Sequence, residues 1–293
     1  MIKDFTYLRP GTLQEALLDL SKYKEGCKVI CGGQSLLILL RQGLVTTDYL
    51  IDIKSLKDLN YIQFDEKNGL KIGATTTHRD IELSGLVKDK VGVLADMERM
   101  LASVQTRNWG TIGGNLCHGD PSSDPAVVLI ALGAMLKMAS SSKERKMAVE
   151  DFFLDYFETA LGKDELLVEI HVPVQEAGTA VAYDKFTVIE NDMGVVSVAA
   201  AVTLERDGAT CKSARIALGN VAPIPKRAIN AEKVLVGEKL NEGRLRKAGQ
   251  MAREEAEPIS DIHGSDEFRR HLVGVYTEKV VRTAWEQART LAR

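Results

Sequence analysis

The sequence predicts an α+β protein of two domains that meet near residue 176. Its 293 residues are enough for about two domains of ordinary size. Segments of helical and of strand spacing follow one another through the first part of the chain, and the composition changes between Pro173 and Thr179. Beyond that point, three segments alternate apolar and polar residues, which predicts antiparallel strands of one sheet.

The composition is that of a globular protein and excludes several classes of function. Apolar residues make up 45% and charged residues 27%, which argues against a disordered or coiled-coil chain. The 38 Lys and Arg residues are balanced by 41 Asp and Glu residues, so we expect no nucleic-acid partner.

The chain carries no signal for a membrane or for export. The longest apolar stretch, Pro125–Leu136, is about 12 residues long, whereas a membrane span needs about 20. The segment Met1–Phe5 carries Asp4 where a signal peptide would turn apolar. Four cysteines are too few for a disulfide scaffold. We therefore expect a cytoplasmic protein without a membrane span.

The N-terminal elements are predicted as strand, helix, strand and helix. Thr12 and Glu15 match a capping box, in which the hydroxyl and the carboxylate each satisfy a free backbone N–H. The apolar residues that follow predict a helix from Leu13 to about Tyr23. A short buried strand, Lys28–Cys31, then leads through a glycine pair into an apolar helical run, Leu36–Leu40.

The middle of the chain mixes strands and helices. Strands are expected at Leu50–Ile53, Tyr61–Phe64 and Leu70–Ile72. Helices are expected from an N-cap at Thr77 through Leu83, over Val91–Ala102 and over Ala126–Leu132. A polar, glycine-rich loop is expected over Val104–Asp124. Asp124 followed by Pro125 has the composition of an N-cap and a first helical residue.

The C-terminal part is predicted as a sheet followed by helices. The strands are expected at Val181–Val188, Val195–Leu204 and Ser213–Leu218. Two helices are expected to finish the chain, over Glu242–Glu255 and Ser265–Leu291.

Two glycine-pair loops are the candidate ligand sites. The first is Cys31–Leu37, in which two glycines and a serine join a strand to a helix. Paired glycines let backbone N–H groups approach an anion, and a helix N-terminus adds a favourable dipole. The second is Gly110–Asn115, within the long loop. Two such loops about 80 residues apart fit a ligand with two phosphates, although each could also be a plain turn.

Other kinds of site find no support in the residues. The chain contains no Gly-x-Gly-x-x-Gly and no Walker A motif, so a dinucleotide would be held by a fold other than the Rossmann fold. The five histidines show no zinc-type spacing, and no Cys-x-x-Cys suggests an iron–sulfur cluster. No Gly-x-Ser-x-Gly elbow supports a hydrolase. We therefore expect no metal and nominate no catalytic acid or base.

The two loops resemble those of the FAD-binding medium subunits of molybdenum hydroxylases, the family of xanthine dehydrogenase, aerobic carbon monoxide dehydrogenase and nicotinate dehydrogenase. Cys31–Leu36 is similar to that family's Ala-Gly-Gly-His/Gln-Ser-Leu loop, and Thr111–Asn115 to its second pyrophosphate loop. Ile72–Thr77, Arg107-Asn108 and Ser122–Pro125 add to the resemblance, which covers the whole chain in order.

The resemblance implies a fold and a domain division. Residues 1–176 would form a vanillyl-alcohol-oxidase-like (PCMH-type) FAD-binding domain of two α/β subdomains, about 1–55 and 56–176. Residues 177–293 would form an α+β C-terminal flavoprotein domain.

The resemblance also implies cofactor-binding residues. The first loop would wrap the FAD pyrophosphate through the backbone of Val29, Ile30, Cys31, Gly32, Gly33, Gln34, Ser35 and Leu36. The second loop would bind its other side through Gly110, Thr111, Gly114 and Asn115. Ser123 and Asp124 would hold the adenosine ribose region. The isoalloxazine would lie near Leu101, Ala102 and Thr106, with Leu166, Leu167 and Lys185 approaching from later strands. Alternatively, Leu101, Ala102, Leu166 and Leu167 are plain core residues, and Lys185 could equally be an exposed strand lysine.

Two departures from the family pattern stand out. Cys31 replaces the alanine that is common in the first loop, which is a small substitution. The segment Val188–Asp192 lacks the arginine that the family often carries before an acid, and this segment would cover the outer face of the flavin.

The resemblance finally implies an electron-transfer role. A large molybdopterin-binding subunit would oxidise the substrate, a small two-iron two-sulfur subunit would relay the electrons, and FAD on this chain would pass them to NAD or another acceptor. Two alternatives stay open. The chain could be a stand-alone flavin oxidoreductase of the same fold, or a nucleotide-binding interaction module without redox activity.

Overall fold

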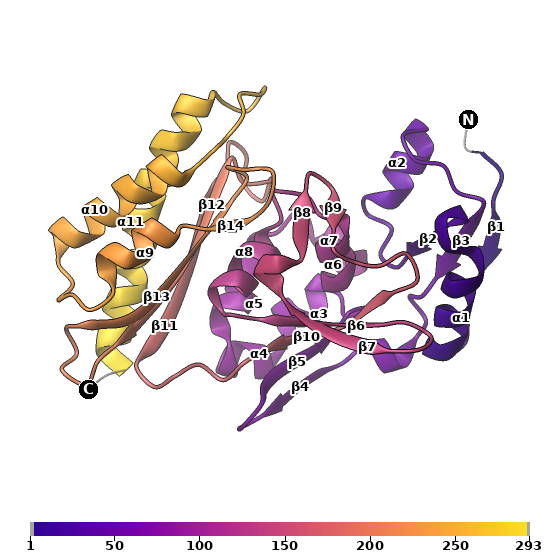
Figure 1. Ribbon diagram of the computed structural model, residues 1–293, viewed down its shortest axis with the longest axis horizontal. Coiled ribbons are helices and arrows are strands. Elements are labelled where there is room, and N and C mark those ends of the chain that lie inside the picture. Colours follow the sequence, from indigo (N-terminus) through magenta and orange to yellow (C-terminus); the bar gives the residue numbers. More distant parts are fainter. Residues whose placement is uncertain (1–2, 292–293) are drawn as a thin grey trace.

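The computed structural model describes residues 3–291 and confirms the predicted α+β class. Met1 and Ile2, part of the segment used above to argue against a signal peptide, lie outside this range. Three sheets follow one another along the longest axis of the molecule, with the N-terminal sheet at one end and the C-terminal sheet at the other (Figure 1). Three short 3-10 turns complete the chain: Lys24–Gly26, Lys57–Leu59 and Val149–Asp151.

The first sheet is parallel, with strand order β1-β3-β2. Its strands are β1 (Thr6–Leu8), β2 (Cys27–Ile30) and β3 (Tyr49–Asp52). Helices α1 (Leu13–Tyr23) and α2 (Leu36–Gln42) connect them. The predicted capping at Thr12 is confirmed. Its Oγ1 accepts from the N–H of Glu15 at 3.2 Å, while Oε2 of Glu15 accepts from the N–H of Gly11 at 2.7 Å.

The second sheet is antiparallel, with strand order β4-β5-β10-β6-β7. Its strands are β4 (Ile62–Asp65), β5 (Gly69–Gly73), β6 (Met135–Ala139), β7 (Glu144–Ala148) and β10 (Leu166–Val172). A small hairpin pairs β8 (Phe153–Asp155) with β9 (Glu158–Thr159). Six helices lie between β5 and β6: α3 (His78–Leu83), α4 (Gly85–Lys90), α5 (Gly92–Met100), α6 (Val104–Trp109), α7 (Ile112–His118) and α8 (Asp124–Ala131).

The predicted long loop over Val104–Asp124 is wrong, because two short helices occupy most of it. Ser103 caps α6 by accepting from the N–H of Thr106 at 3.2 Å. Thr111 caps α7 by accepting from the N–H of Gly114 at 3.2 Å. The helix predicted over Val91–Ala102 is shorter than expected, since α5 ends at Met100.

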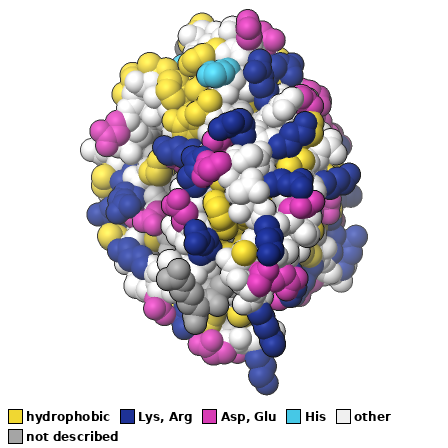
Figure 2. All heavy atoms as spheres, turned by 90° about the vertical axis from the view of Figure 1, so that its left-hand side faces the viewer, with side chains coloured by type: hydrophobic (Ala, Val, Ile, Leu, Met, Phe, Trp, Pro, Cys, Tyr) yellow, Lys and Arg dark blue, Asp and Glu magenta, His cyan; other side chains and the backbone are white. Residues whose placement is uncertain are grey.

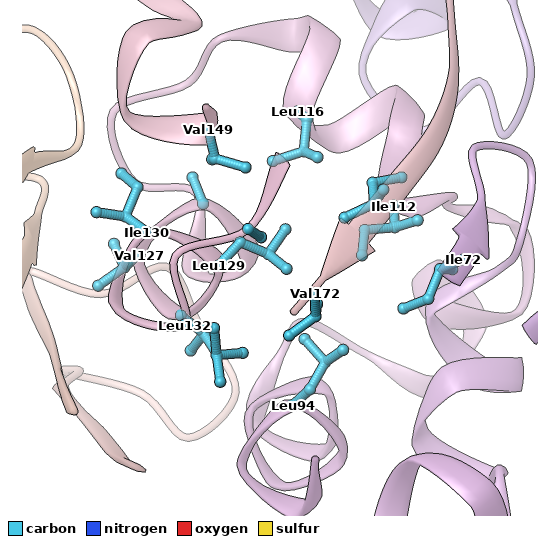
Figure 3. Packing of buried hydrophobic residues seen from close by; sticks show 14 of the residues in the cluster. Ile72, Leu94, Ile112, Leu116, Val127, Leu129, Ile130, Leu132, Val149 and Val172 are labelled. Atoms are coloured by element: carbon cyan, nitrogen blue, oxygen red, sulfur yellow. The ribbon is translucent and has the colours of Figure 1, made fainter. Parts of the chain in front are cut away.

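The main core lies between the second sheet and these helices. All eight residues of α8 are buried, so this helix is enclosed on every side. Its apolar side chains pack with residues of α5, α7 and β10, among them Leu94, Leu116 and Val172 (Figure 3). A fully buried side chain of this size contributes about 1.5–3 kcal/mol through the hydrophobic effect. The cluster therefore holds the helices that carry the second glycine loop in place.

The third sheet is an antiparallel meander, as predicted. Its strands are β11 (Thr179–Phe186), β12 (Val196–Leu204), β13 (Cys211–Gly219) and β14 (Lys226–Arg227). Helices α9 (Ile229–Leu235), α10 (Glu242–Glu255) and α11 (Asp266–Leu291) complete this part. All nine residues of β12 are buried, because α8 covers one face of the sheet and α11 the other. The sheet is thus shared between both halves of the molecule.

Charged side chains of both signs lie on the outer face of the C-terminal part. Basic and acidic side chains alternate over the surface that α10 and α11 form (Figure 2). Among residues 3–291, no helix combines the length and the apolar character that a membrane crossing requires.

A close helix contact provides a test of the C-terminal packing. A Cβ on Gly249 of α10 would lie 2.5 Å from the carbonyl oxygen of Gly274 of α11. We expect Gly249→Ala to lower the free energy of unfolding by about 1–3 kcal/mol, because the helices must separate. Gly92→Ala is the control, since nothing lies within 4 Å of its Cβ position. Urea unfolding that gives both variants the same stability would contradict this packing.

Candidate functional site

The first glycine loop presents a run of unused backbone donors. It joins β2 to α2, and Gly33 adopts φ +69°, which favours glycine. Among the described residues, none accepts a hydrogen bond from the N–H groups of Gly32, Gly33, Gln34, Ser35 or Leu36. These five residues are all partly accessible to solvent. Consecutive free N–H groups before a helix are suited to binding an anion.

The two glycine loops touch, as the sequence predicted for a shared ligand. A Cβ on Gly32 would lie 2.8 Å from Cα of Gly110 and closer still to the carbonyl oxygen of Trp109. Only glycine fits at position 32, because the backbone of the second loop fills the space beside it. The contact brings residues about 80 positions apart into one site.

The second loop differs from the first, because most of its backbone donors are already used. The N–H of Gly110 donates to Thr106 at 2.7 Å, and that of Gly113 to Ala74 at 3.0 Å. The N–H groups of Gly114 and Asn115 donate to Oγ1 and to the carbonyl oxygen of Thr111. This loop therefore has fewer free backbone donors than the first loop.

Ser123 links the second loop to α8. Its hydroxyl donates to Oδ1 of Asn115 at 2.5 Å and accepts from the N–H of Ala126 at 3.2 Å. Ser123 is thus the N-cap of α8, which corrects the prediction that Asp124 fills this role. Asp124 is the first helical residue, because the serine hydroxyl reaches the free N–H of the first turn.

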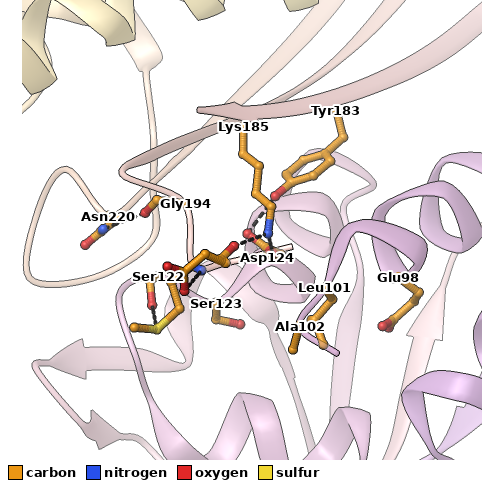
Figure 4. Close-up of polar contacts among 12 residues, drawn as sticks. Glu98, Leu101, Ala102, Ser122, Ser123, Asp124, Tyr183, Lys185, Gly194 and Asn220 are labelled. Atoms are coloured by element: carbon orange, nitrogen blue, oxygen red, sulfur yellow. Dashed lines mark hydrogen bonds and ion pairs between the residues drawn. The ribbon is translucent and has the colours of Figure 1, made fainter. Parts of the chain in front are cut away.

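Asp124 is enclosed and paired with the C-terminal part. Its Oδ1 accepts from the hydroxyl of Tyr183 at 2.6 Å, and its Oδ2 lies 2.6 Å from Nζ of Lys185 (Figure 4). The side chains of Asp124 and Lys185 are 5% and 2% exposed, so Lys185 is not an exposed strand lysine. Burial raises the pKa of Asp124, and Lys185 acts in the opposite direction. Burial and the nearby carboxylate raise the pKa of Tyr183, which keeps its hydroxyl protonated as a donor.

A second set of contacts joins the segment before β12 to α8. Nζ of Lys185 also donates to the carbonyl oxygen of Asp192 at 2.8 Å. Asn220, at φ +59°, donates from Nδ2 to Gly194 at 2.7 Å and from its backbone N–H to Pro121 at 2.8 Å (Figure 4). These bonds place the segment that departs from the family pattern directly beside Asp124.

Arg107 shapes the segment predicted to lie near the isoalloxazine. Ala102 has φ +45°, which is rare for a residue with a Cβ. Nη1 of the buried Arg107 donates to the carbonyl oxygens of Leu101 and Ala102, at 2.6 Å each, while its Nε donates to Glu82 at 2.9 Å. Thr106 lies nearby on α6, with its hydroxyl bonded to Ser103. Arg107 was noted in the sequence without a role, which only this geometry reveals.

Five of the predicted residues lie within sheets, among them Lys185 of β11. Val29 and Ile30 belong to β2 and pair with Ile51 and Asp52 of β3. Leu166 and Leu167 belong to β10 and are 3% and 4% exposed, each within a hydrophobic core.

No motif singles out His78 or Glu98, which pair beneath the second loop. Nδ1 of His78 lies 2.8 Å from Oε2 of Glu98. His78 directly follows the N-cap Thr77, and this position was the only local signal for it. Taken together, free N–H groups, hydroxyls and an amide form a donor set that fits a dinucleotide.

The Asp124–Lys185 pair gives a stability prediction. We expect Lys185→Met to lower the free energy of unfolding by about 3–5 kcal/mol, because it leaves an enclosed carboxylate without its partner. Adding Asp124→Asn should recover part of this loss. The control is Lys233→Met at an exposed lysine of α9, with an effect within about 0.5 kcal/mol. If urea unfolding shows the double variant to be as unstable as Lys185→Met, the unpaired carboxylate is not the cause of the loss.

Comparisons with known proteins agree with this geometry. Residues 3–175 match the family described as the FAD binding domain in molybdopterin dehydrogenase. Residues 181–284 match the CO dehydrogenase flavoprotein C-terminal domain. The glyceraldehyde dehydrogenase medium chain of Sulfolobus acidocaldarius is 37% identical over 94% of this chain and 96% of the relative. The carbon monoxide dehydrogenase medium chain of Afipia carboxidovorans is 34% identical over 97% and 98%.

Solved structures show the same fold. Carbon monoxide dehydrogenase from Hydrogenophaga pseudoflava, in a form that lacks the Mo-pyranopterin moiety, matches with a TM-score of 0.94 and 31% identity, over 98% of this chain and 99% of that one. Quinoline 2-oxidoreductase from Pseudomonas putida 86 matches with a TM-score of 0.92 and 32% identity, over 99% of both chains. The suspected resemblance is thereby confirmed, and with it FAD as the cofactor and the oxidoreductase class. The chain belongs to the FAD-binding medium subunits of the molybdenum hydroxylases.

Proposed function

We propose that this chain is the electron-transfer subunit of a heteromeric molybdenum hydroxylase. A large molybdopterin-binding subunit oxidises the substrate, a small two-iron two-sulfur subunit relays the electrons, and NAD or another acceptor receives them from FAD. FAD, when bound, takes up electrons singly or in pairs. The relatives support this proposal, because they are the medium chains of two dehydrogenases and the medium subunit of a hydroxylase.

The free N–H groups of the first loop carry the proposal. We infer that Gly32, Gly33, Gln34, Ser35 and Leu36 hold the pyrophosphate, with Cys31, Val29 and Ile30 positioning the loop. Thr111, Gly114 and Asn115 would complete the site from the second loop, beside Gly110. Ser123 and Asp124 would hold the adenosine ribose region, and Lys185, which pairs with Asp124, would approach the isoalloxazine from β11.

The flavin side of the site is inferred from the residues around Arg107. Leu101, Ala102 and Thr106 would lie near the isoalloxazine, on the turn that Arg107 holds. Leu166 and Leu167 would support it from β10. No residue is assigned as a catalytic acid or base, because the cofactor carries the chemistry and the protein positions it.

We also propose that the chain divides into parts 1–55, 56–176 and 177–293. Support comes from the three sheets, whose strands fall within residues 6–52, 62–172 and 179–227. A cytoplasmic location is inferred from the four cysteines, none of which forms a disulfide in the part of the chain that the structure describes.

An absorption spectrum of the chain purified without added cofactor tests the function. We expect flavin bands near about 370 and 450 nm, and release of FAD on denaturation. Mass spectrometry of the same sample should identify molybdopterin-binding and iron–sulfur subunits. A stable, active chain without partners would favour a stand-alone oxidoreductase. A chain that stays colourless with added FAD would contradict both the electron-transfer subunit and the stand-alone oxidoreductase.

The loop contact predicts a defect in FAD binding for Gly32→Ala. The added Cβ would separate the loops, because it meets the backbone of residues 109 and 110. We expect the dissociation constant for FAD, from flavin fluorescence quenching, to rise at least tenfold. Gly85→Ala is the control, since its Cβ position is open. Unchanged affinity in Gly32→Ala would show that the loop contact does not shape the site.

A further inference from the structure

His78 and Glu98 form an enclosed pair that the roles above leave unused. Nδ1 of His78 and Oε2 of Glu98 lie 2.8 Å apart, and the side chains are 3% and 0% exposed. The pair joins the start of α3 to α5, beneath the second glycine loop. Glu98 lies near the turn of Leu101 and Ala102 (Figure 4).

The other edge of the His78 ring faces the contact between the loops. A Cβ on Gly110 would lie 3.1 Å from Cδ2 of His78 and 3.5 Å from Cγ of Gln34. Because Cδ2 is bonded to Nε2, the edge that carries Nε2 and a first-loop side chain flank the same point. The backbone N–H of His78 donates to the carbonyl oxygen of Gly110 at 3.0 Å, which holds the residue there.

The described part of the chain offers no hydrogen-bond partner to Nε2 of His78. Among the described residues, the His78 ring makes one hydrogen bond, through Nδ1. Oε1 of Glu98 is fully enclosed and also lacks a partner among these residues. Nε2 is therefore an unused group on the ring edge beside Gly110, while Glu98 is bound to Nδ1.

The enclosure of the pair determines whether Nε2 carries a hydrogen. A net charge shielded from water is costly, so an uncharged pair is favoured. The neighbouring charges do not compensate it, because Arg107 is paired with Glu82 and Asp124 with Lys185.

Two arrangements of the pair have no net charge. One is an imidazolium beside a carboxylate, and the other is a neutral imidazole that accepts at Nδ1 from a protonated Glu98. Nε2 carries a hydrogen in both. Burial raises the pKa of Glu98, although His78 opposes this, and protonation leaves Oε1 as an unpaired neutral oxygen. In either arrangement Nε2 is a donor.

We propose that His78 is a further cofactor-binding residue: Nε2–H donates a hydrogen bond to an acceptor oxygen of FAD where the two loops meet. Glu98 is its positioning residue, because it orients the ring and keeps the proton on Nε2. This inference rests on the proposed FAD site and adds a donor from α3, outside both glycine loops.

Titration of the full chain with FAD tests the proposal. His78→Phe keeps a ring against Gly110 and removes the donor, so we expect the dissociation constant to rise about tenfold. His78→Gln, which retains an N–H donor, should recover most of the affinity. His271→Phe, at an exposed position of α11, is the control. Wild-type affinity in His78→Phe overturns the inference, whereas a wild-type chain that binds no FAD overturns the proposed function instead.

Two further variants separate orientation from simple packing. In Glu98→Gln the amide can donate to Nδ1, which leaves the hydrogen on Nε2, so affinity should stay within about twofold. Glu98→Leu removes the partner, and we expect a loss of at least fivefold. Equal affinities for these two variants would contradict the positioning role of Glu98.

A measurement on the wild-type chain covers the case in which His78→Phe does not fold. In ¹⁵N-histidine spectra, with signals assigned by replacing the other four histidines in turn, FAD should shift the Nε2 signal of His78. An Nε2 signal that does not move when FAD binds would overturn the proposal.

Discussion

The enclosed carboxylate of Asp124 is the constraint on which both halves of the molecule depend. It stands at the first turn of α8, where the helix dipole favours a negative charge, but the surrounding core removes it from water. Its two donors, Tyr183 and Lys185, both come from β11 of the C-terminal sheet. The helix can therefore be buried only when that sheet is packed against it, so the C-terminal part completes the site rather than being appended to it.

Two parts of the fold form the contact between the glycine loops. The first loop follows β2 of the parallel sheet, and the second lies among the helices around α8. Backbone bonds tie the second loop to the segment after β5, since Ile112 donates to Thr76 and His78 to Gly110. The site thus forms where the first and second sheets meet, and neither sheet could form it alone.

The sequence predicted the elements whose signals are local. The helix Glu242–Glu255 has the predicted bounds, because Asn241 caps it and its apolar residues keep helical spacing. The sequence predicts a loop where the short helices α6 and α7 lie, because six or seven residues show no clear period and the stability of such helices comes from packing. Their caps, Ser103 and Thr111, were the only local trace of them. The sequence analysis assigns no strand to β6 and β7, although they pair with each other as a local hairpin; the pairing of β6 with β10 joins distant segments.

Motifs nominated most residues of the candidate site, but their contacts follow from tertiary structure. The run of free donors in the first loop could be expected from its glycines and the helix that follows. The pairing of Asp124 with Lys185, of Arg107 with Glu82 and of His78 with Glu98 each join segments that no local pattern relates. A histidine counted as ordinary in the sequence becomes distinctive only through what lies on each side of its ring.

The two loops also differ in which substitutions they can accept. In the first loop, the free groups belong to the backbone, so a side chain can change if the conformation is kept. Cys31 fits this rule, since it replaces a common alanine and burial raises the pKa of its thiol, which leaves it a small uncharged group. In the second loop, Thr111 and Asn115 are committed through their side chains, one as a helix cap and the other to Ser123. The side chains of the first loop should therefore tolerate more substitutions, while those of the second loop are constrained by their own hydrogen bonds.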